Sequence, residues 1–178
     1  MIRLFVALWA PDAVADQLEM LQSGVPGARW STREQFHLTL RFIGEVDGRD
    51  AGAIDDALSG VSAPRFSMQI KGVGEFGGRR PRALWAGVTP NEALVHLQRK
   101  IETALQRIGI EAEPRKFTPH VSLARLKATP RGRVMDYIVD HALYASAPFA
   151  VTAFILYSSH LSPNGSIYRA EHSYRLRG

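Results

Sequence analysis

Hydrophobic and polar positions recur along this chain with two different periods, and each period predicts one kind of element. Strict alternation, or a short apolar run bounded by Pro, Gly or Asn, predicts a β-strand. Apolar residues at helical spacing predict a helix, most strongly where Leu94, Leu97, Ile101 and Leu105 share one face. We expect strands at 2–9, 36–43, 66–73, 83–89, 121–126, 149–160 and 167–176, and helices at 13–22, 51–58, 92–108 and 133–143.

An internal repeat organises these elements. The segment His37-Leu38-Thr39-Leu40 recurs as His120-Val121-Ser122-Leu123, and the two histidines are 83 residues apart (120 − 37). Ala-Pro opens the strands near Phe66 and Phe149, which are also 83 residues apart (149 − 66). A half-chain of about 85 residues would bury little core by itself. We therefore expect one α+β domain over residues 1–178, in which two pseudo-symmetric lobes, each an antiparallel sheet with outer helices, form one central cleft.

The repeated segments place chemistry on one face of two strands. In the alternating segment 37–42, His37, Thr39 and Arg41 share a face, while the three apolar residues point to the core. The second copy places His120 and Ser122 on one face in the same way. If the lobes are related by a pseudo-two-fold axis, two imidazoles and two hydroxyls converge, and Arg41 is expected to border the same cleft.

Two histidines that meet in a cleft are suited to acid–base chemistry at phosphate. Histidine titrates near neutral pH, so one ring can give a proton while the other takes one. In-line displacement at phosphorus needs both steps, on opposite sides of the phosphate. Thr39 and Ser122 can donate hydrogen bonds to the phosphate oxygens. Four other histidines have no such partner: we expect structural or surface roles for His96 and His141, whereas His160 and His172, on the final hairpin, could border the cleft.

The composition excludes several other classes of protein. Apolar residues make up 46% of the chain and charged residues 22%, which is typical of a globular protein and not of a disordered one. The chain has no cysteine, so disulfides and Cys-ligated zinc are excluded, and neither histidine motif contains a carboxylate for a zinc site. We expect no metal and no cofactor. The apolar run 2–9 is too short for a membrane span or a signal peptide, so a cytoplasmic protein is expected.

Charge points to an anionic partner. With 22 Lys+Arg against 17 Asp+Glu, the net charge is +5, and segment 114–133 has six basic residues and no acidic one. Arg79, Arg80 and Arg82 form a second basic cluster. We expect both clusters to steer RNA to the cleft. Arg125, five residues after His120, faces away from it in a regular strand and reaches the cleft only if the strand bulges or ends near Ala124.

At these residues the chain resembles the two-histidine phosphoesterase superfamily, and in particular its bacterial and archaeal RNA 2′,3′-cyclic phosphodiesterases, also called 2′-5′ RNA ligases. The resemblance rests on both His-x-Thr/Ser-x motifs, at 37–40 and 120–123, and extends over essentially the whole chain. Ser122 stands where that branch more often has Thr, and the hydroxyl is kept.

The resemblance implies an activity and roles for the candidate residues. The implied reaction is hydrolysis of an RNA terminal 2′,3′-cyclic phosphate to a 2′-phosphate, without metal or cofactor. His37 is implied as the proton donor to the leaving 3′ oxygen and His120 as the proton acceptor from water. Thr39 and Ser122 are implied as phosphate ligands, and Arg125 as a further one.

Other functions remain open from the sequence alone. The same site could open a small cyclic phosphate of a nucleoside or of ADP-ribose, or it could run in reverse and join RNA ends through a 2′-5′ bond. A non-catalytic RNA-binding module is a third alternative, although binding alone does not require two titratable groups. The expected partners are RNA 3′ ends with a cyclic phosphate, such as tRNA fragments or other small RNAs. No membrane partner is expected, and we expect a monomer.

Overall fold

The computed structural model describes residues 1–177. Most strands lie close to the predicted positions, but the expected strands 66–73 and 149–160 are each divided in two, and a short strand at 28–30 was not predicted. Gly178, the last residue of the expected domain, lies outside the described residues. The strands are β1 (Ile2–Trp9), β2 (Ala28–Trp30), β3 (His37–Val46), β4 (Phe66–Met68), β5 (Ile70–Phe76), β6 (Ala83–Val88), β7 (His120–Leu126), β8 (Phe149–Val151), β9 (Ala153–Ser162) and β10 (Gly165–Arg175). The helices are α1 (Asp12–Met20), α2 (Gly48–Ser59), α3 (Glu92–Arg107) and α4 (Arg131–Asp140), with a short 3-10 helix, η1 (Arg33–Gln35).

The main sheet is antiparallel, and apart from the edge strand β10 and the short strand β2 its strand order is symmetric. The order is β10-β9-β1-β3-β7-β6-β5, and β2 also pairs with β7. The two halves of the sheet meet at a single β3–β7 pair, Leu38 opposite Val121. These two residues are 83 apart (121 − 38), so each faces its own equivalent in the repeat. A pseudo-two-fold axis therefore passes through this pair, and the predicted α+β fold with two related halves is confirmed.

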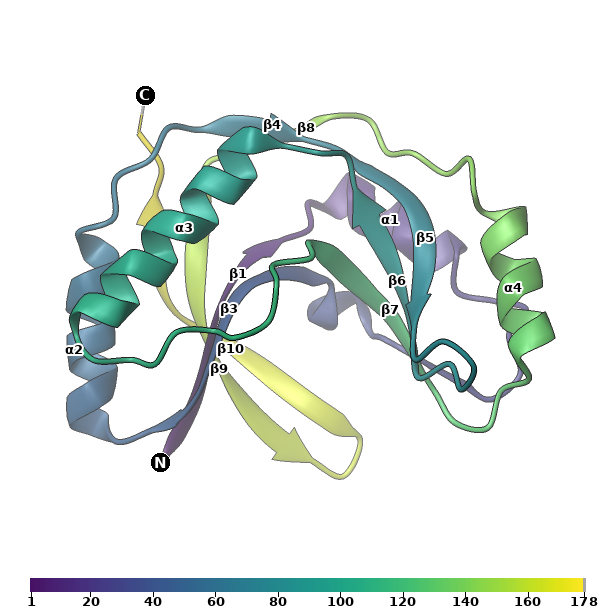
Figure 1. Cartoon of the computed structure of the whole chain (residues 1–178), viewed down its shortest axis with the longest axis horizontal. Coiled ribbons are helices and arrows are strands. Elements are labelled where there is room, and N and C mark those ends of the chain that lie inside the picture. The colour runs from purple at the N-terminus through teal and green to yellow at the C-terminus, as the bar shows by residue number, and fades with distance from the viewer. Residues whose placement is uncertain (178) are drawn as a thin grey trace.

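A second, two-stranded sheet marks the other end of the same axis. Strand β4 pairs with β8, with Ser67 opposite Ala150, and these residues are again 83 apart (150 − 67). The two Ala-Pro landmarks of the sequence lie directly before these strands. Each landmark therefore leads its copy of the repeat to the axis, where the two copies pair with each other (Figure 1).

Each lobe is built from both copies of the repeat (Figure 1). The first lobe, which we define as β1, β3, β9, β10, α2 and α3, has α3 on β3 and α2 on β10. The second lobe, defined as β2, β5, β6, β7, α1 and α4, has α4 on β5, and the Tyr137 hydroxyl of α4 donates to the Leu21 carbonyl at the end of α1. The last strand of each copy thus joins the lobe that is centred on the other copy.

Side-chain caps mark the start of two of the helices. Asp47 and Asn91 cap α2 and α3, since each side chain accepts a hydrogen bond from a backbone N–H in the first turn. The apolar faces of the helices cover the sheet, with Leu18, Ile54, Leu97 and Val134 fully buried. Among the described residues, no helix is both long and apolar enough to cross a membrane.

Candidate active site

The pair Leu38–Val121 brings the two sequence motifs together. Both side chains are buried in the core, so the neighbouring residues of each strand point to the opposite face. Extending the antiparallel register by one residue places His37 opposite Ser122 and Thr39 opposite His120. These four residues, which we call the two-histidine centre, surround the pseudo-two-fold axis on one face of the sheet.

His120 is held in one tautomer. Its Nδ1 lies 2.6 Å from the carbonyl oxygen of Thr118, and a carbonyl can only accept, so Nδ1 carries a proton and donates it. The lone pair of the neutral ring is then on Nε2. The ring contacts Phe76 edge-on, with 4.9 Å between centroids, and Trp85 lies beyond it at 6.3 Å. The arrangement suits Nε2 to accept a proton.

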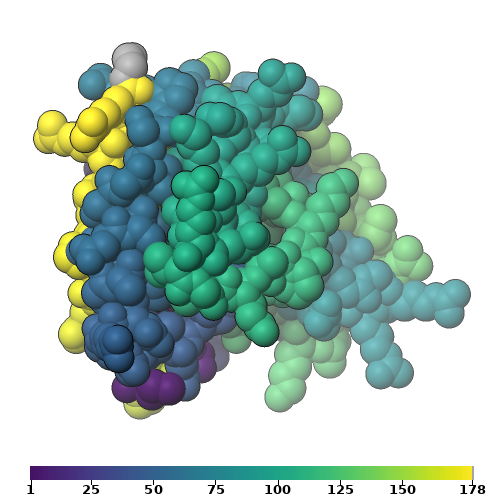
Figure 2. Space-filling view, turned by 60° about the vertical axis from the view of Figure 1, so that its left-hand side comes forward, coloured from purple at the N-terminus to yellow at the C-terminus, as the bar shows by residue number. Residues whose placement is uncertain are grey.

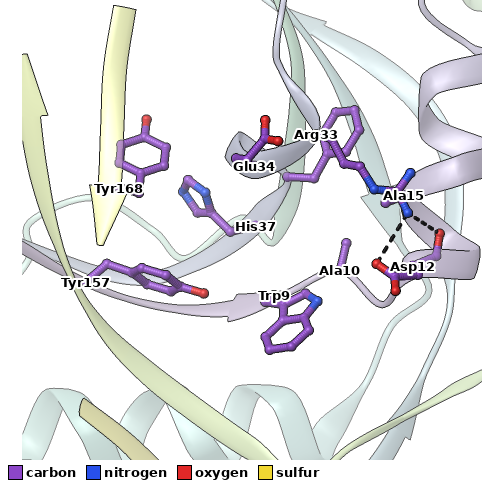
Figure 3. A pocket seen from close by; sticks show the side chains of 10 residues that line it. Trp9, Ala10, Asp12, Ala15, Arg33, Glu34, His37, Tyr157 and Tyr168 are labelled. Atoms are coloured by element: carbon purple, nitrogen blue, oxygen red, sulfur yellow. Dashed lines mark hydrogen bonds and ion pairs between the residues drawn. The ribbon is translucent and has the colours of Figure 1, made fainter. Parts of the chain in front are cut away.

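His37 lies in a less polar environment than His120. Its ring is 4.9 Å from Phe5, 5.0 Å from Tyr168 and 6.3 Å from Tyr157 between centroids, and the two tyrosines lie on either side of His37 in Figure 3. The pKa of His37 is lowered from 6.5 to about 4, mainly because the ring is buried; a hydrogen bond to the backbone of Gln35 acts to raise this pKa, and the charge of the nearby His120 acts to lower it. The effect of His120 on the pKa of His37 indicates that the two imidazoles are close enough to interact electrostatically.

Both central strands carry a bulge at the same point of the repeat. In β3, Thr39 faces Ala7 of β1 and Arg41 faces Val6, so Leu40 is an extra residue. In β7, Ser122 faces Trp85 of β6 and Ala124 faces Leu84, so Leu123 is extra. Leu40 and Leu123 are 83 residues apart (123 − 40). An extra residue shifts the alternation by one, so the fifth residue after each histidine returns to the histidine face and the fourth leaves it.

The prediction that Arg41 shares a face with His37 and Thr39 is wrong, and the bulge is the reason. Arg41 is only 6% exposed and points toward α3. Its Nε donates to Glu102 at 2.5 Å, and its other nitrogens donate to the backbone carbonyls of Phe42 and Glu111. Arg41 therefore holds α3 and the following loop to the sheet, away from the two-histidine centre.

The same kind of bulge places Arg125 on the face of Ser122, where its side chain is exposed. The condition that the sequence sets for Arg125 to reach the cleft is therefore met. Arg29 of β2 lies directly opposite Arg125 in the ladder. Like charges directly opposite each other are unfavourable, and in residues 1–177 neither guanidinium forms an ion pair. Such a pair of free cations is suited to bind an anion.

Arg29 is a candidate that the sequence pattern misses. Strand β2 is three residues long, too short for an alternating pattern to mark it. The only available signal is its position a few residues before the first motif. The structure also separates the long basic segment: Arg115 pairs with Glu113, whereas Arg131 begins α4 in the second lobe. Within the described residues, no group of three or more His, Asp or Glu side chains could hold a metal ion.

Comparisons with known proteins agree with this geometry. The family model of the 2′-5′ RNA ligase superfamily matches residues 10–162. The chain is 32% identical to an RNA 2′,3′-cyclic phosphodiesterase of Thermotoga maritima, over 99% of this chain and 97% of that protein. It is 30% identical to a protein of the same name from Archaeoglobus fulgidus, over 94% and 97% of the two chains.

Solved structures share the fold over the same extent. The protein TT0787 of Thermus thermophilus superimposes with a TM-score of 0.84 at 26% identity, covering 99% of this chain and 98% of that one. Escherichia coli LigT, in a complex with 3′-AMP, superimposes with a TM-score of 0.80 at 24% identity, covering 98% of each chain. With the family model and the full-length relatives in agreement, this chain belongs to the 2′-5′ RNA ligase superfamily.

Proposed function

We propose that this chain is a phosphodiesterase that opens the terminal 2′,3′-cyclic phosphate of RNA and leaves a 2′-phosphomonoester. The observation that carries the proposal is the duplicated centre, in which two histidines and two hydroxyls face one point around a symmetry axis. The relatives from Thermotoga maritima and Archaeoglobus fulgidus are both named RNA 2′,3′-cyclic phosphodiesterase. The two-histidine arrangement supplies an acid and a base on opposite sides of a bound phosphate, which a purely binding module would not need.

The reaction follows from the surroundings of the two rings. His120 takes a proton from water through Nε2, because its Nδ1 is held by the Thr118 carbonyl. The water oxygen bonds to phosphorus, the bond from phosphorus to the 3′ oxygen breaks, and His37 gives its proton to that oxygen. The product carries a 2′-phosphate and a free 3′-hydroxyl. Thr39 and Ser122 donate to the non-bridging oxygens, where negative charge develops.

Protonation of His37 is coupled to substrate binding in this scheme. Burial keeps its ring neutral in the free protein at neutral pH. A phosphate beside the ring favours the charged form and raises the pKa, so the anion itself prepares the acid. Arg125, on the face of Ser122, and Arg29, opposite Arg125 in the ladder, add two further positive charges that help to hold the anion.

We infer that the RNA strand leaves the site along a basic loop of the second lobe. Arg79, Arg80 and Arg82 are exposed on the loop between β5 and β6, and this loop projects from the body of the molecule (Figure 2, teal, at the right). The Leu126 N–H donates to the Arg82 carbonyl, so the loop is fixed beside the end of β7. We infer that these arginines steer RNA ends, such as tRNA fragments or other small RNAs, toward a monomeric enzyme.

The test uses a short RNA that ends in a 2′,3′-cyclic phosphate, incubated with the protein in excess EDTA. We expect a 2′-phosphate product, identified by ³¹P NMR. His37→Ala and His120→Ala should each lower the rate roughly 10²–10⁴-fold, which is what loss of acid or base assistance typically costs. His96→Ala on the remote face of α3 is the matched control and should retain the activity.

Several outcomes would overturn the proposal. Activity that EDTA removes and zinc or manganese restores would contradict a metal-free mechanism. Near-normal turnover by a correctly folded His37→Ala or His120→Ala variant would exclude the two-histidine mechanism. A product joined to an added 5′-hydroxyl RNA, without net hydrolysis, would favour ligation instead.

A further inference from the structure

A cavity of about 310 Å³ opens beside His37, on the side away from His120. The end of β1, the start of α1, η1 and the β9–β10 hairpin enclose it, and its walls include Trp9, Glu34, Tyr157 and Tyr168 (Figure 3). His120 does not line it. The cavity, which we call the His37 cavity, is thus an extension of the two-histidine centre on the side of His37, and its volume is at the small end of the size range of small-molecule sites.

The proposed function, on which this inference rests, determines which part of the substrate lies beside His37. In a 2′,3′-cyclic phosphate, the leaving 3′ oxygen belongs to the same ribose that keeps the 2′-phosphate. His37 protonates that oxygen, whereas the water attacks from the side of His120. The ribose and its base therefore lie on the side of His37, where the cavity opens.

The walls of the His37 cavity suit a nucleobase. Trp9 stands opposite His37 in the β1–β3 ladder, so both side chains point to the same face, and yet Trp9 is 62% exposed. An indole that is packed so little contributes little to the core. Bases stack on aromatic rings without sequence preference, and a flat exposed indole offers this contact. Tyr157 and Tyr168, whose rings pack around His37, close the cavity on the other side.

A carboxylate at the cavity adds a selective element. Glu34 is exposed, lines the cavity, and forms no ion pair within residues 1–177, because the neighbouring Arg33 is engaged by Asp16 and Glu19. A free carboxylate repels phosphate, so it is better suited to the base end of the ligand. A carboxylate only accepts hydrogen bonds, and guanine offers two adjacent N–H donors on its Watson–Crick edge, whereas uracil offers one.

We propose that the His37 cavity binds the base of the nucleotide that carries the cyclic phosphate, with Trp9 as the stacking surface and Glu34 as an acceptor that favours guanine. Trp9 and Glu34 are then specificity residues for the proposed reaction. Neither touches the reacting atoms, so their effect should be confined to substrates that have a base.

The test compares the four nucleoside 2′,3′-cyclic phosphates with methyl riboside 2′,3′-cyclic phosphate, which has no base. Trp9→Ala should lower kcat/KM on the nucleoside substrates roughly 5- to 100-fold, mainly through KM, as expected for one base–aromatic stack. Activity on the base-free substrate should be unchanged. Trp9→Phe should restore most of the loss, and Glu34→Gln should reduce the preference for guanosine over uridine. Leu143→Ala, a change at an exposed residue outside the cavity, is the control.

The outcomes separate this inference from the proposed function. If Trp9→Ala lowers kcat/KM equally on the nucleoside and base-free substrates, or on neither, the cavity is not a base site. The proposed function would still stand. A wild-type protein that opens none of these substrates would contradict the proposed function. In that case, calorimetry still tests the base site by measuring the affinity of the protein for guanosine 2′-monophosphate and for ribose phosphate. Equal affinities, or a ratio of affinities that Trp9→Ala does not change, would exclude the cavity as a base site.

Discussion

His37 combines two properties that are unusual in a proton donor, a buried ring and a partner histidine. Its pKa of about 4 means that the ring is neutral in the free protein near pH 7. The proposed acid is therefore protonated only when an anion is bound next to it. The aromatic rings that surround His37 create this dependence, because they remove water from the ring without supplying a compensating charge.

This pKa predicts how stability depends on pH. An unfolded His37 has its ordinary pKa of 6.5, so between pH 6.5 and 4 the unfolded chain binds more protons than the folded one. The contribution of His37 to the free energy of unfolding is therefore constant above this window and decreases as the pH is lowered through it. The full loss is at most about 3 kcal/mol, since one pKa unit corresponds to about 1.4 kcal/mol.

Urea unfolding of the wild type and of His37→Gln at pH 7.5, 5.5 and 4.5 measures this effect. The difference in stability between the two proteins should shift in favour of the variant as the pH falls. Added inorganic phosphate should make the stability of the wild type depend less on pH, because the bound anion favours the charged form of the His37 ring. Parallel pH profiles for the two proteins, without phosphate, would contradict the assignment.

The paired bulges of β3 and β7 decide which arginines reach the cleft. The sequence 37–42 alternates without interruption, so it contains no sign that Leu40 is an extra residue. The partner that draws Arg41 away, Glu102, lies 61 residues further along the chain, and local patterns do not reveal it. By contrast, the strands, the main helices and the converging motifs are predictable, because periodicity and the repeat are properties of the sequence itself.

Arg41 should therefore behave as a structural residue. Arg41→Ala leaves Glu102 without its buried partner, and breaking a buried ion pair costs about 3–5 kcal/mol of stability. Arg115→Ala removes an exposed ion pair with Glu113 and should cost about 1 kcal/mol or less. Urea unfolding compares the two variants, and KM on a cyclic nucleotide should be unchanged in the folded fraction of each. A raised KM with unchanged stability in Arg41→Ala would instead indicate that Arg41 lies in the cleft and contacts the substrate.

Arg29 and Arg125 should show the opposite behaviour. Removing either charge relieves the repulsion between them, so Arg29→Ala and Arg125→Ala should leave the free energy of unfolding unchanged or raise it by up to about 1 kcal/mol. Both should weaken the binding of inorganic phosphate, and more at low salt than at high salt. Calorimetry at two salt concentrations measures the affinity, with Arg80→Ala on the projecting loop as the control for general charge. Destabilisation without loss of phosphate affinity would show that the two arginines are structural.

At the scale of the whole molecule, the exchange of strands between the two copies couples the lobes. Strand β9, from the second copy, pairs with β1 of the first, and β5 of the first copy pairs with β6 of the second. The Leu38–Val121 and β4–β8 pairs join the copies at the axis. Neither copy keeps a complete lobe when it is separated from the other. We therefore propose that residues 1–178 fold as one cooperative unit, with the two-histidine centre at its symmetry axis.

Cutting the chain within the exposed loop between β5 and β6 tests this proposal. A break after Gly78, which has open space around it, divides the protein into 1–78 and 79–178 close to the boundary between the copies. Each fragment alone exposes strand edges and apolar faces that the other fragment covers, so each should lack a cooperative thermal transition by circular dichroism. An equimolar mixture should recover the transition and, because each fragment carries one histidine of the centre, cyclic-phosphate hydrolysis. Pairing 1–78 with a 79–178 fragment that has His120→Ala should restore the transition without the activity. A cooperative transition in either fragment by itself would show that the copies fold independently.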